Sequence, residues 1–473
     1  MSKLDFLCLA PFLILATAPI IMMITITISR NFRVIVGFSL IMFLAAFISL
    51  FFVLPVAPHY IGTLLVIDPF GIMVLGAVFC ISFLIVLISF AYLNNHGGER
   101  EEYFIILFVA ALGASILVAA NHFVTFFLGL ESLSISLYVL IAYLKLRDYG
   151  VEAGVKFLVI ASVATAFLLF GMALIYAATG SMSFAAIGKA IAASGLSPLL
   201  LDGLGLMIVG IGFKLALVPF HMWTPDVYQG APAPVTTFIA TISKGSVLAI
   251  ALRFFFEIQG YRYRALILAL SVIAVLSMFT GNLLALKQTN FKRLLAYSSI
   301  AHLGYLVITL LTGTPYGIQA ALFYLISYMI TTMGAFGVIS LMSVCESDAE
   351  NLDDLKGLFW NNPWIAIVLS LTLLSLAGIP LTAGFIAKFY LVLAGLRSGL
   401  WVLVISLIIN SVISLYYYLR VIKIMFTPSE TKPYVNLSFA GNLVLALVVI
   451  GILFLGLLPS FLVKIINSLS TLI

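Results

Sequence analysis

Long apolar runs recur from end to end of this 473-residue chain, separated by charged residues, glycine or proline. Such runs can cross the ~30 Å hydrocarbon core of a bilayer as helices, at about 1.5 Å per residue. We predict fourteen spans, beginning near residues 7, 34, 67, 102, 122, 156, 199, 231, 263, 291, 315, 363, 399 and 437. The runs at 67–94 and 363–391 are unusually long, so we expect them to tilt or break. The pattern thus predicts an all-α, multi-pass (polytopic) membrane protein.

Composition supports this interpretation and excludes two others. The chain is 64% hydrophobic and 8% charged, whereas about a quarter of a soluble chain is charged. Membrane β-barrels are excluded because their short strands alternate polar and apolar residues. The apolar run after Asp5 continues directly into further spans, so we expect no cleavable signal peptide. The lipid bilayer is then the expected surrounding, and the pI of 9.1 reflects membrane topology, with no nucleic-acid partner.

The distribution of Lys and Arg predicts the orientation. One set of alternate loops holds 13 of the 23 basic residues, and the other set, with both termini, holds 7. By the positive-inside rule the richer set is cytoplasmic, so both termini are expected outside. The richer set is Arg30, Arg33, Arg100, Lys145, Arg147, Lys156, Lys287, Lys292, Arg293, Lys356, Arg420, Lys423 and Lys432. The basic turn at 253–264 runs against this trend.

Few ionisable residues lie inside the predicted spans. The three remaining basic residues are Lys214, Lys244 and Lys388, and of 17 acidic residues only Glu131 lies deep in a span. His302 is a further titratable side chain there. A lysine or carboxylate at the bilayer centre costs roughly 2.5–3.5 kcal/mol on insertion scales, so such residues are functional candidates.

The segment GFKLALVPFHMWTPDVYQGAPAPVTTFIATISK, residues 212–244, joins two spans through a polar, proline-rich crossing. Counting at about 1.5 Å per residue places Lys214 and Lys244 roughly 18 Å inside their spans. The crossing carries the polar or aromatic residues His221, Trp223, Asp226 and Gln229. These residues fit a structural cap on a broken helix as well as a gate.

A second interrupted span follows five spans later. The twelfth span contains LAGIPLTAGFIAKFY, in which Gly378 and Pro380 precede Lys388. A unit of five spans repeated in tandem must have an inverted second copy, and matching interrupted spans point to ion pathways. We therefore expect an N-terminal three-helix segment (1–101), two inverted five-helix repeats (102–257 and 258–427) with broken helices 7 and 12, and a C-terminal helix (428–473).

Glu131 and Lys214 form the most informative pair. Burial favours the neutral form of a lone carboxylate or a lone lysine, whereas two such groups brought together can both ionise. A pair that is made and broken can therefore move a proton. The alternative is a static ion pair that fixes helix packing.

Lys244 and Lys388 have no acidic residue near them in their spans. A desolvated lysine without a counter-ion can exchange its proton. Lys244 is too far from either membrane surface to extend its ammonium into water, but that interpretation stays open for Lys388. His302, beside Ser298 and Ser299, can relay a proton between waters or simply pack as a hydrogen-bonded histidine.

Lys156 follows Glu152 by one turn at the start of its span. It fits an interfacial lysine as well as a weaker member of a proton path. Tyr416, Tyr417 and Tyr418 fit an interfacial aromatic belt. Cys8, Cys80 and Cys345 are far apart, and no P-loop or dinucleotide fingerprint occurs. Metal, haem, iron–sulfur and nucleotide sites are therefore not expected in this chain.

Four segments carry a family resemblance: FLGLESLSISLYVLIAY, the 212–244 segment, TNFKRLLAYSSIAHLGY, and GLFWNNPWIAIVLSLTLLSLAGIPLTAGFIAKFYL. With them the chain resembles, over nearly its whole length, the antiporter-like membrane subunits of respiratory complex I, the proton-pumping NADH:quinone oxidoreductase. The resemblance implies that Glu131 is the family's helix-5 glutamate and that Lys214, Lys244 and Lys388 are its lysines of helices 7, 8 and 12. Lys156 matches an additional helix-6 lysine.

The resemblance further implies a hydrophilic axis along the membrane plane, in which redox chemistry in other subunits drives proton movement. NADH, FMN, iron–sulfur clusters and quinone are then expected in partner subunits, with no cofactor in this chain. The expected partners are the other membrane subunits of complex I, and the expected location is a bacterial plasma (inner) membrane.

Within the family, the chain's end at Ile473 leaves no room for the long lateral helix of L-type subunits, and M-type subunits usually carry glutamate where Lys388 stands. Both features favour the bacterial N type. Subunits of multisubunit cation/proton antiporters and membrane-bound hydrogenases share these motifs and are the alternative. A non-pumping structural subunit also stays open. A stand-alone solute carrier is less favoured, since no substrate-pocket signature occurs.

Overall fold

The structure is a computed structural model that describes residues 2–94, 100–144, 149–343, 348–429, 435 and 438–470, without the side chains of 468–470. Lys145, Arg147, Cys345 and Lys432, which entered the charge and cysteine patterns, lie outside the described residues. Among the described residues, 13 helices are long and apolar enough to cross a membrane. The prediction of a multi-pass α-helical membrane protein is confirmed.

Every predicted span start falls within six residues of a helix start. The first three spans are α1 (Lys3–Ile28), α2 (Phe32–Val53) and α3 (Pro69–Leu93). The next five are α4 (Glu102–Ala119), α5 (Phe123–Ile141), α6 (Gly150–Thr179), α8 (Pro198–Leu215) with α9 (Trp223–Gly230), and α10 (Ala233–Phe238) with α11 (Lys244–Glu257). The last six are α12 (Arg264–Leu286), α13 (Phe291–Thr312), α14 (Pro315–Met342), α16 (Pro363–Ala377) with α17 (Ala383–Arg397), α18 (Trp401–Phe426) and α19 (Phe439–Leu457). The shorter elements are α7 (Phe184–Ser194), α15 (Leu358–Asn361) and α20 (Pro459–Ser470).

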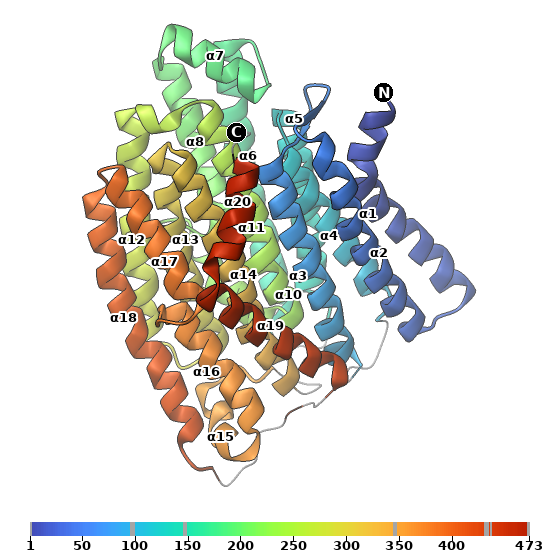
Figure 1. Ribbon diagram of the computed structural model, residues 1–473. Coiled ribbons are helices and arrows are strands. Elements are labelled where there is room, and N and C mark those ends of the chain that lie inside the picture. The colour runs from blue at the N-terminus through green and yellow to red at the C-terminus, as the bar shows by residue number, and fades with distance from the viewer. Residues whose placement is uncertain are drawn as a thin grey trace.

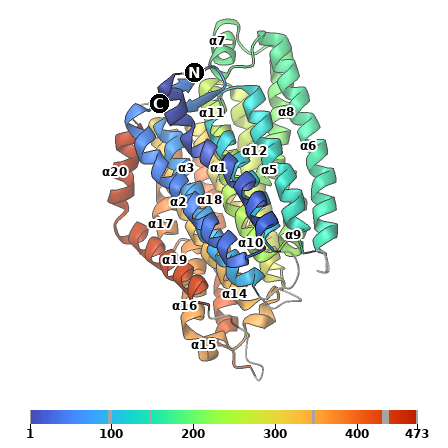
Figure 2. The same ribbon diagram turned by 90° about the vertical axis from the view of Figure 1, so that its right-hand side faces the viewer.

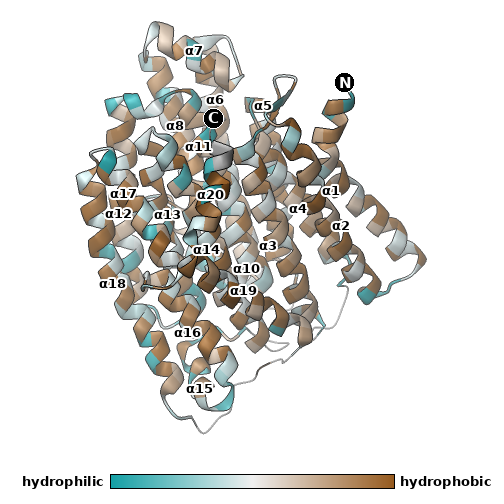
Figure 3. Cartoon of the chain, in the orientation of Figure 1, coloured by the Kyte–Doolittle hydropathy of each residue, from teal (hydrophilic) through white to brown (hydrophobic). Residues whose placement is uncertain are grey.

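The helices stand side by side in one bundle, with α13 and α14 in its interior (Figure 1). α1 begins and α20 ends at the same end of the bundle, where α7 also lies, and α15 lies at the opposite end (Figures 1 and 2). Hydrophobic positions dominate the length of the helices, as Figure 3 shows. Large apolar side chains on α1, α2, α6 and α18 are exposed, as expected for surfaces that face lipid or neighbouring subunits.

For the long run at 67–94 the structure shows no break within α3, so tilt stays the remaining prediction for this run. Its first residue belongs to β2 (Leu65–Ile67), which pairs antiparallel with β1 (His59–Ile61) in a hairpin that the apolar pattern did not predict. Asp68 then caps α3 by accepting a hydrogen bond from the Gly71 N–H, with Pro69 as first helical residue. These signals start one continuous helix.

Asp68 also forms a two-fold ion pair with Arg253 of α11, at 2.6 and 2.9 Å. Burial raises the pKa of the Asp68 carboxyl, but the Arg253 charge and the hydrogen bonds to the carboxylate hold it below its usual range. The hairpin end of α3 is therefore fixed to α11.

Two spans are interrupted where the sequence predicts it. α8 ends at Leu215, and Ala216 adopts a left-handed conformation (φ 59°) before α9 begins at Trp223. α16 ends at Ala377, and Gly378 (φ 87°) opens the second interruption before α17 begins. The polar crossing was predicted as a loop, but Trp223–Gly230 forms the helix α9. A further feature, absent from the predictions, is the π-helical turn Ile239–Ser243 directly before Lys244.

The expected division at residues 101, 257 and 427 falls at helix ends or in connections. The described part of the 428–473 segment contains two helices, α19 and α20, with a bend at Leu458. That the two middle units are inverted copies of each other stays a prediction.

Candidate functional site

Glu131 and Lys214 lie on neighbouring elements, α5 and the last turn of α8, but each has its own polar partner. Thr165 of α6 donates a hydrogen bond to Glu131 Oε1 at 2.8 Å. Lys214 Nζ donates to Ser134 Oγ at 2.6 Å, and Ser134 stands one turn after Glu131 on α5. The described side chains of Glu131 and Lys214 form no direct ion pair with each other. Each member of the pair that the sequence suggested therefore bonds a hydroxyl group and not the other member.

Aromatic side chains pack around the break after α8 and around Lys214. Trp223 at the start of α9 donates from Nε1 to the Phe213 carbonyl at 2.9 Å, and the same carbonyl accepts from the Ala216 N–H at the end of α8. The Lys214 ammonium lies 5.9 Å from the Phe157 ring centroid and 6.0 Å from that of Phe213. These are cation–π distances, and the side chain of Lys214 is buried.

Lys244 starts α11 directly after the π-helical turn, a deformation frequent at functional sites. Its Nζ donates to Ser299 Oγ of α13 at 2.8 Å. The ammonium also lies 5.1 Å from the Tyr228 ring centroid and 6.0 Å from that of Trp223. Lys244 is 1% exposed, so an extended lysine that reaches the membrane surface is excluded.

Lys388 lies in α17, after the second break, and its side chain extends back to the end of α16. Its Nζ donates to the Ala377 carbonyl at the end of α16, at 2.8 Å, and lies 5.5 Å from the Tyr305 ring centroid. The side chain is 6% exposed. The interpretation left open from the sequence, an ammonium extended to the interface, is therefore wrong for this lysine.

His302 lies on α13, and a tyrosine hydroxyl contacts each of its two ring nitrogens. Nδ1 is 2.6 Å from the Tyr324 hydroxyl and Nε2 is 3.4 Å from that of Tyr418. Tyr418 also bonds Ser298, and Tyr417 donates to Asn282 Oδ1. Tyr417 and Tyr418 are fully buried, so their assignment to an interfacial belt was wrong; of the three, Tyr416 faces outward at 66% exposure.

The sequence analysis missed a polar stripe on α14. Its side chains are hydroxyl groups within a buried span, at i, i+3, i+4, i+7 and i+8, which is one helix face. The stripe consists of Tyr324, Ser327, Tyr328, Thr331 and Thr332. Tyr328 bonds Ser299 at 2.7 Å, and Thr331 bonds Ser375 of α16 at 3.2 Å. A search for polar residues at helical spacing, instead of charged ones, would have found it.

The remaining candidates lie in a charged cluster where α6, α9 and α13 meet. Lys156, about half exposed, pairs with Glu152 at 2.6 Å and lies 3.7 Å from Asp226. Arg293 donates to Asp226 at 2.7 Å and to Gln229 Oε1 at 3.1 Å. Asp226 and Gln229 therefore fix the end of α9. A role for Lys156 in proton transfer stays a prediction.

His221 lies in the break itself and is buried. Its Nδ1 has no hydrogen-bond partner among the described protein atoms. These observations fit a cap on the broken helix as well as a gate, the two roles that the sequence allowed for His221.

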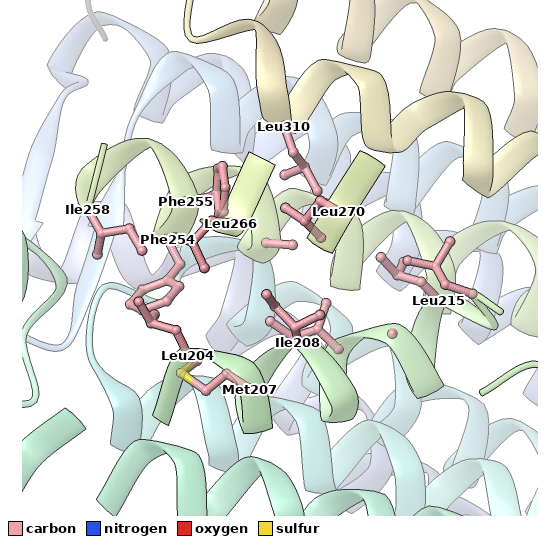
Figure 4. Close-up of a pocket in the computed structure, with 14 residues that line it drawn as sticks. Leu204, Met207, Ile208, Leu215, Phe254, Phe255, Ile258, Leu266, Leu270 and Leu310 are labelled. Carbon is pink, nitrogen blue, oxygen red and sulfur yellow. The ribbon is translucent and has the colours of Figure 1, made fainter. Parts of the chain in front are cut away.

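An apolar cavity of about 40 Å³ lies beside the first break, between α8, α11 and α12. Figure 4 shows Leu204, Ile208, Leu215, Phe254 and Leu270 around it. Its lining side chains carry no groups that could pass a proton. The serines that hold Lys214 and Lys244 lie on α5 and α13 and do not line this cavity.

The family described as NADH:quinone oxidoreductase/Mrp antiporter, TM, matches residues 120–414. The chain belongs to this family. It is 44% identical over 456 residues to NADH-quinone oxidoreductase subunit N of Methylococcus capsulatus, which is 95% of this chain and 92% of the relative. The family resemblance seen in the sequence motifs is confirmed.

Solved structures share this fold. A chain of respiratory complex I from Thermus thermophilus with bound aureothin matches with a TM-score of 0.84 and 32% identity, covering 96% of this chain and 98% of that chain. A chain of the archaeal membrane-bound sulfane sulfur reductase matches at 0.86 and 26% identity, covering 100% and 97%. A chain of the Mrp complex from Dietzia sp. DQ12-45-1b shares the fold at 0.88, with 19% identity over 100% and 97%.

Proposed function

We propose that this chain is a proton-translocating membrane subunit of an NADH:quinone oxidoreductase. The observation that carries the proposal is the buried row of three lysines, each with a neutral acceptor: Ser134 for Lys214, Ser299 for Lys244 and the Ala377 carbonyl for Lys388. Burying three lysines within a membrane is energetically costly, and residues placed there at such a cost are functional candidates. The 44% identity to a subunit N supports the choice of complex.

In this proposal Glu131 sets the charge state of Lys214. When the two side chains approach, both ionise; when Ser134 and Thr165 hold them apart, Lys214 gives up its proton more readily. Lys244 receives that proton, and Lys388 releases it outside. The electrons travel in partner subunits, which hold NADH, FMN, iron–sulfur clusters and quinone.

The chain then acts as part of an oxidoreductase complex without carrying a redox centre itself. Its partners are the other membrane subunits, in a bacterial inner membrane. The Lys and Arg distribution supports an orientation with both termini outside. The interrupted helices α8–α9 and α16–α17, five spans apart, support the two inverted repeats.

The test is acidification of inverted membrane vesicles on addition of NADH, comparing wild type with Lys214→Ala at matched levels of assembled complex. We expect NADH oxidation and acidification to fall together in the variant. Wild-type rates of both NADH oxidation and acidification in Lys214→Ala would make Lys214 structural. If a sodium gradient drives proton movement and NADH drives none, the chain belongs to a cation/proton antiporter instead.

A further inference from the structure

Two small polar cavities flank Tyr328 in the interior of the bundle. One, of about 10 Å³, is lined by Ser298, Ser299 and Thr332 together with Tyr328. The other, also about 10 Å³, lies on the side of Lys388 and is lined by polar residues of α13, α14 and α16. Each is at the lower bound of the volume that holds one water molecule. Tyr328 lines both.

The second cavity has a buried hydroxyl to bind a water. Ser327 is 1% exposed, lines that cavity, and its Oγ has no hydrogen-bond partner among the described protein atoms. A buried hydroxyl without a partner is destabilising, because it loses its hydrogen bonds to water without gaining others. A water that also contacts Lys388 and Ser375, which line the same cavity, would satisfy it.

The His302 imidazole also lines the second cavity, but the hydrogen bond of Lys244 goes to Ser299 and not to this ring. Both ring nitrogens are engaged by tyrosine hydroxyls, at 2.6 and 3.4 Å. Lys244 instead reaches Ser299, and Ser299 reaches Tyr328 at 2.7 Å. The direct contacts from Lys244 thus lead to α14 and not to the histidine.

We propose that each cavity binds one water and that the Tyr328 hydroxyl, with a water held by Ser327, relays the proton from Lys244 to Lys388. This inference rests on the proposed function and names the residues that perform its central step. The water in the first cavity bonds Ser298, Ser299 and Thr332 and orients the Ser299 hydroxyl.

The transfer balances without any other reactant. The Lys244 ammonium gives a proton to Ser299 Oγ, and the Ser299 hydroxyl proton moves to the Tyr328 oxygen. The Tyr328 proton moves to the water, which passes one of its own protons to the neutral Lys388 amine. Lys244 ends neutral, Lys388 ends charged, and the two hydroxyls and the water are unchanged except in orientation.

The experiment measures NADH-driven proton pumping by the complete complex, at matched assembly, in Tyr328→Phe and Ser327→Ala. Loss of one hydrogen bond from a transfer step lowers its rate by about tenfold, so we expect that loss in Tyr328→Phe. Two substitutions on the same helix serve as controls, because they leave the proposed proton route intact. They are Tyr316→Phe, near the start of α14, and Ser340→Ala, where the wild-type serine donates to the Phe336 carbonyl of its own helix.

A solvent isotope effect separates a relay from a structural role. When the relay is weakened, proton transfer limits the rate, so the ratio of rates in H₂O and D₂O should rise in Tyr328→Phe above that of wild type. A packing defect would lower the rate without raising this ratio, and that result would overturn the proposal. Should Tyr328→Phe fail to assemble, Ser327→Ala gives the same test through the second water.

Lys244→Met, measured alongside, distinguishes a failure of the relay from a failure of the proposed function. If Lys244→Met loses pumping while Tyr328→Phe and Ser327→Ala keep it, the relay is wrong and the proposed function stands. If all three variants pump at the wild-type rate, the proposed function itself fails.

Discussion

At the scale of single residues, the buried lysines are held by neutral groups. The ammonium groups of Lys214 and Lys244 bond serine hydroxyls, that of Lys388 bonds a backbone carbonyl, and all three lie near aromatic rings. A lysine in a direct buried ion pair would lose several kcal/mol on releasing its proton, because it would leave its partner charge uncompensated. Neutral acceptors make that loss smaller, which suits a group that must bind and release protons repeatedly.

Ser134 is the residue at which this can be tested most simply. Hydrogen bonds to charged groups contribute about 1.5–3 kcal/mol. In Ser134→Ala, we expect Lys214 to shift towards Glu131 and the pumping rate to fall by roughly tenfold. The measurement is vesicle acidification by NADH.

Ser136→Ala is the matched control, because Ser136 lies on the same helix and bonds the Ser132 carbonyl instead of a lysine. Equal rates in Ser134→Ala and wild type would show that the hydroxyl does not position Lys214.

At the scale of elements, both interruptions present the end of a half-helix to a lysine. Lys214 stands in the last turn of α8, and Lys388 returns from α17 to the final carbonyls of α16. The negative end of a helix dipole stabilises a cation by about 0.3–1 kcal/mol, and more when partly buried. The breaks thus supply favourable sites for charge in the middle of a span without adding an acidic residue.

Gly378 makes the second of these sites. Its φ of 87° disfavours any side chain, and an added Cβ would lie 2.9 Å from Lys388 Cδ. We expect Gly378→Ala to displace the lysine and abolish most coupled activity, measured as the rate of NADH-driven proton pumping.

Gly399→Ala is the control, since Gly399 has a φ of 72° but nothing within 4 Å of an added Cβ. It shares the backbone strain of about 1–2 kcal/mol without the contact to the lysine. Similar losses in both variants would assign the effect to strain alone.

The ion pair of Lys292 and Asp348 fixes the other end of the first broken span. Lys292 Nζ bonds Asp348 at 2.7 Å and the Gln229 and Ala231 carbonyls at 2.9 and 2.6 Å, and both charged side chains are fully buried. Removing one partner of a buried pair costs about 3–5 kcal/mol. Asp348→Ala should therefore lower the thermal unfolding temperature of the purified complex.

Asp353→Ala is the comparison, because Asp353 pairs with Lys356 on the surface. Exposed pairs contribute about 0–1 kcal/mol, so this variant should unfold close to wild type. If Asp348→Ala is equally stable, Lys292 does not hold α9 in place.

At the scale of the whole molecule, the spans and both interruptions could be predicted because they depend on local signals. Apolar runs set the helix lengths, and the Gly378 and Pro380 pair marks the break of the twelfth span. The direct pairing of Glu131 and Lys214 could not be decided, since it depends on the distance between α5 and α8 and on the hydroxyls between them. Tyr417 and Tyr418 were assigned wrongly because a run of tyrosines looks the same whether it faces lipid or the neighbouring helices. The α14 stripe was overlooked because hydroxyl residues are common in membrane helices and only their spacing distinguishes them.

The expected orientation can be tested by labelling in right-side-out vesicles. Lys189 lies in α7, at the end where α1 begins, and Trp360 lies in α15 at the opposite end (Figure 1). With Cys8, Cys80 and Cys345 replaced by serine, a membrane-impermeant maleimide should label Lys189→Cys and leave Trp360→Cys unlabelled. The reverse pattern would place the termini in the cytoplasm.

The most direct test of the account measures the rates of proton pumping and of NADH oxidation by assembled complex that carries Lys244→Met, a change that keeps an unbranched side chain of similar length and removes its charge. We predict that pumping and NADH oxidation fall together, because Lys244 is the middle of the row and has no second charged group to replace it among the residues described around it. Wild-type rates at the normal proton-to-NADH ratio would contradict the account, since a complex that pumps normally without this lysine does not move its protons along the row.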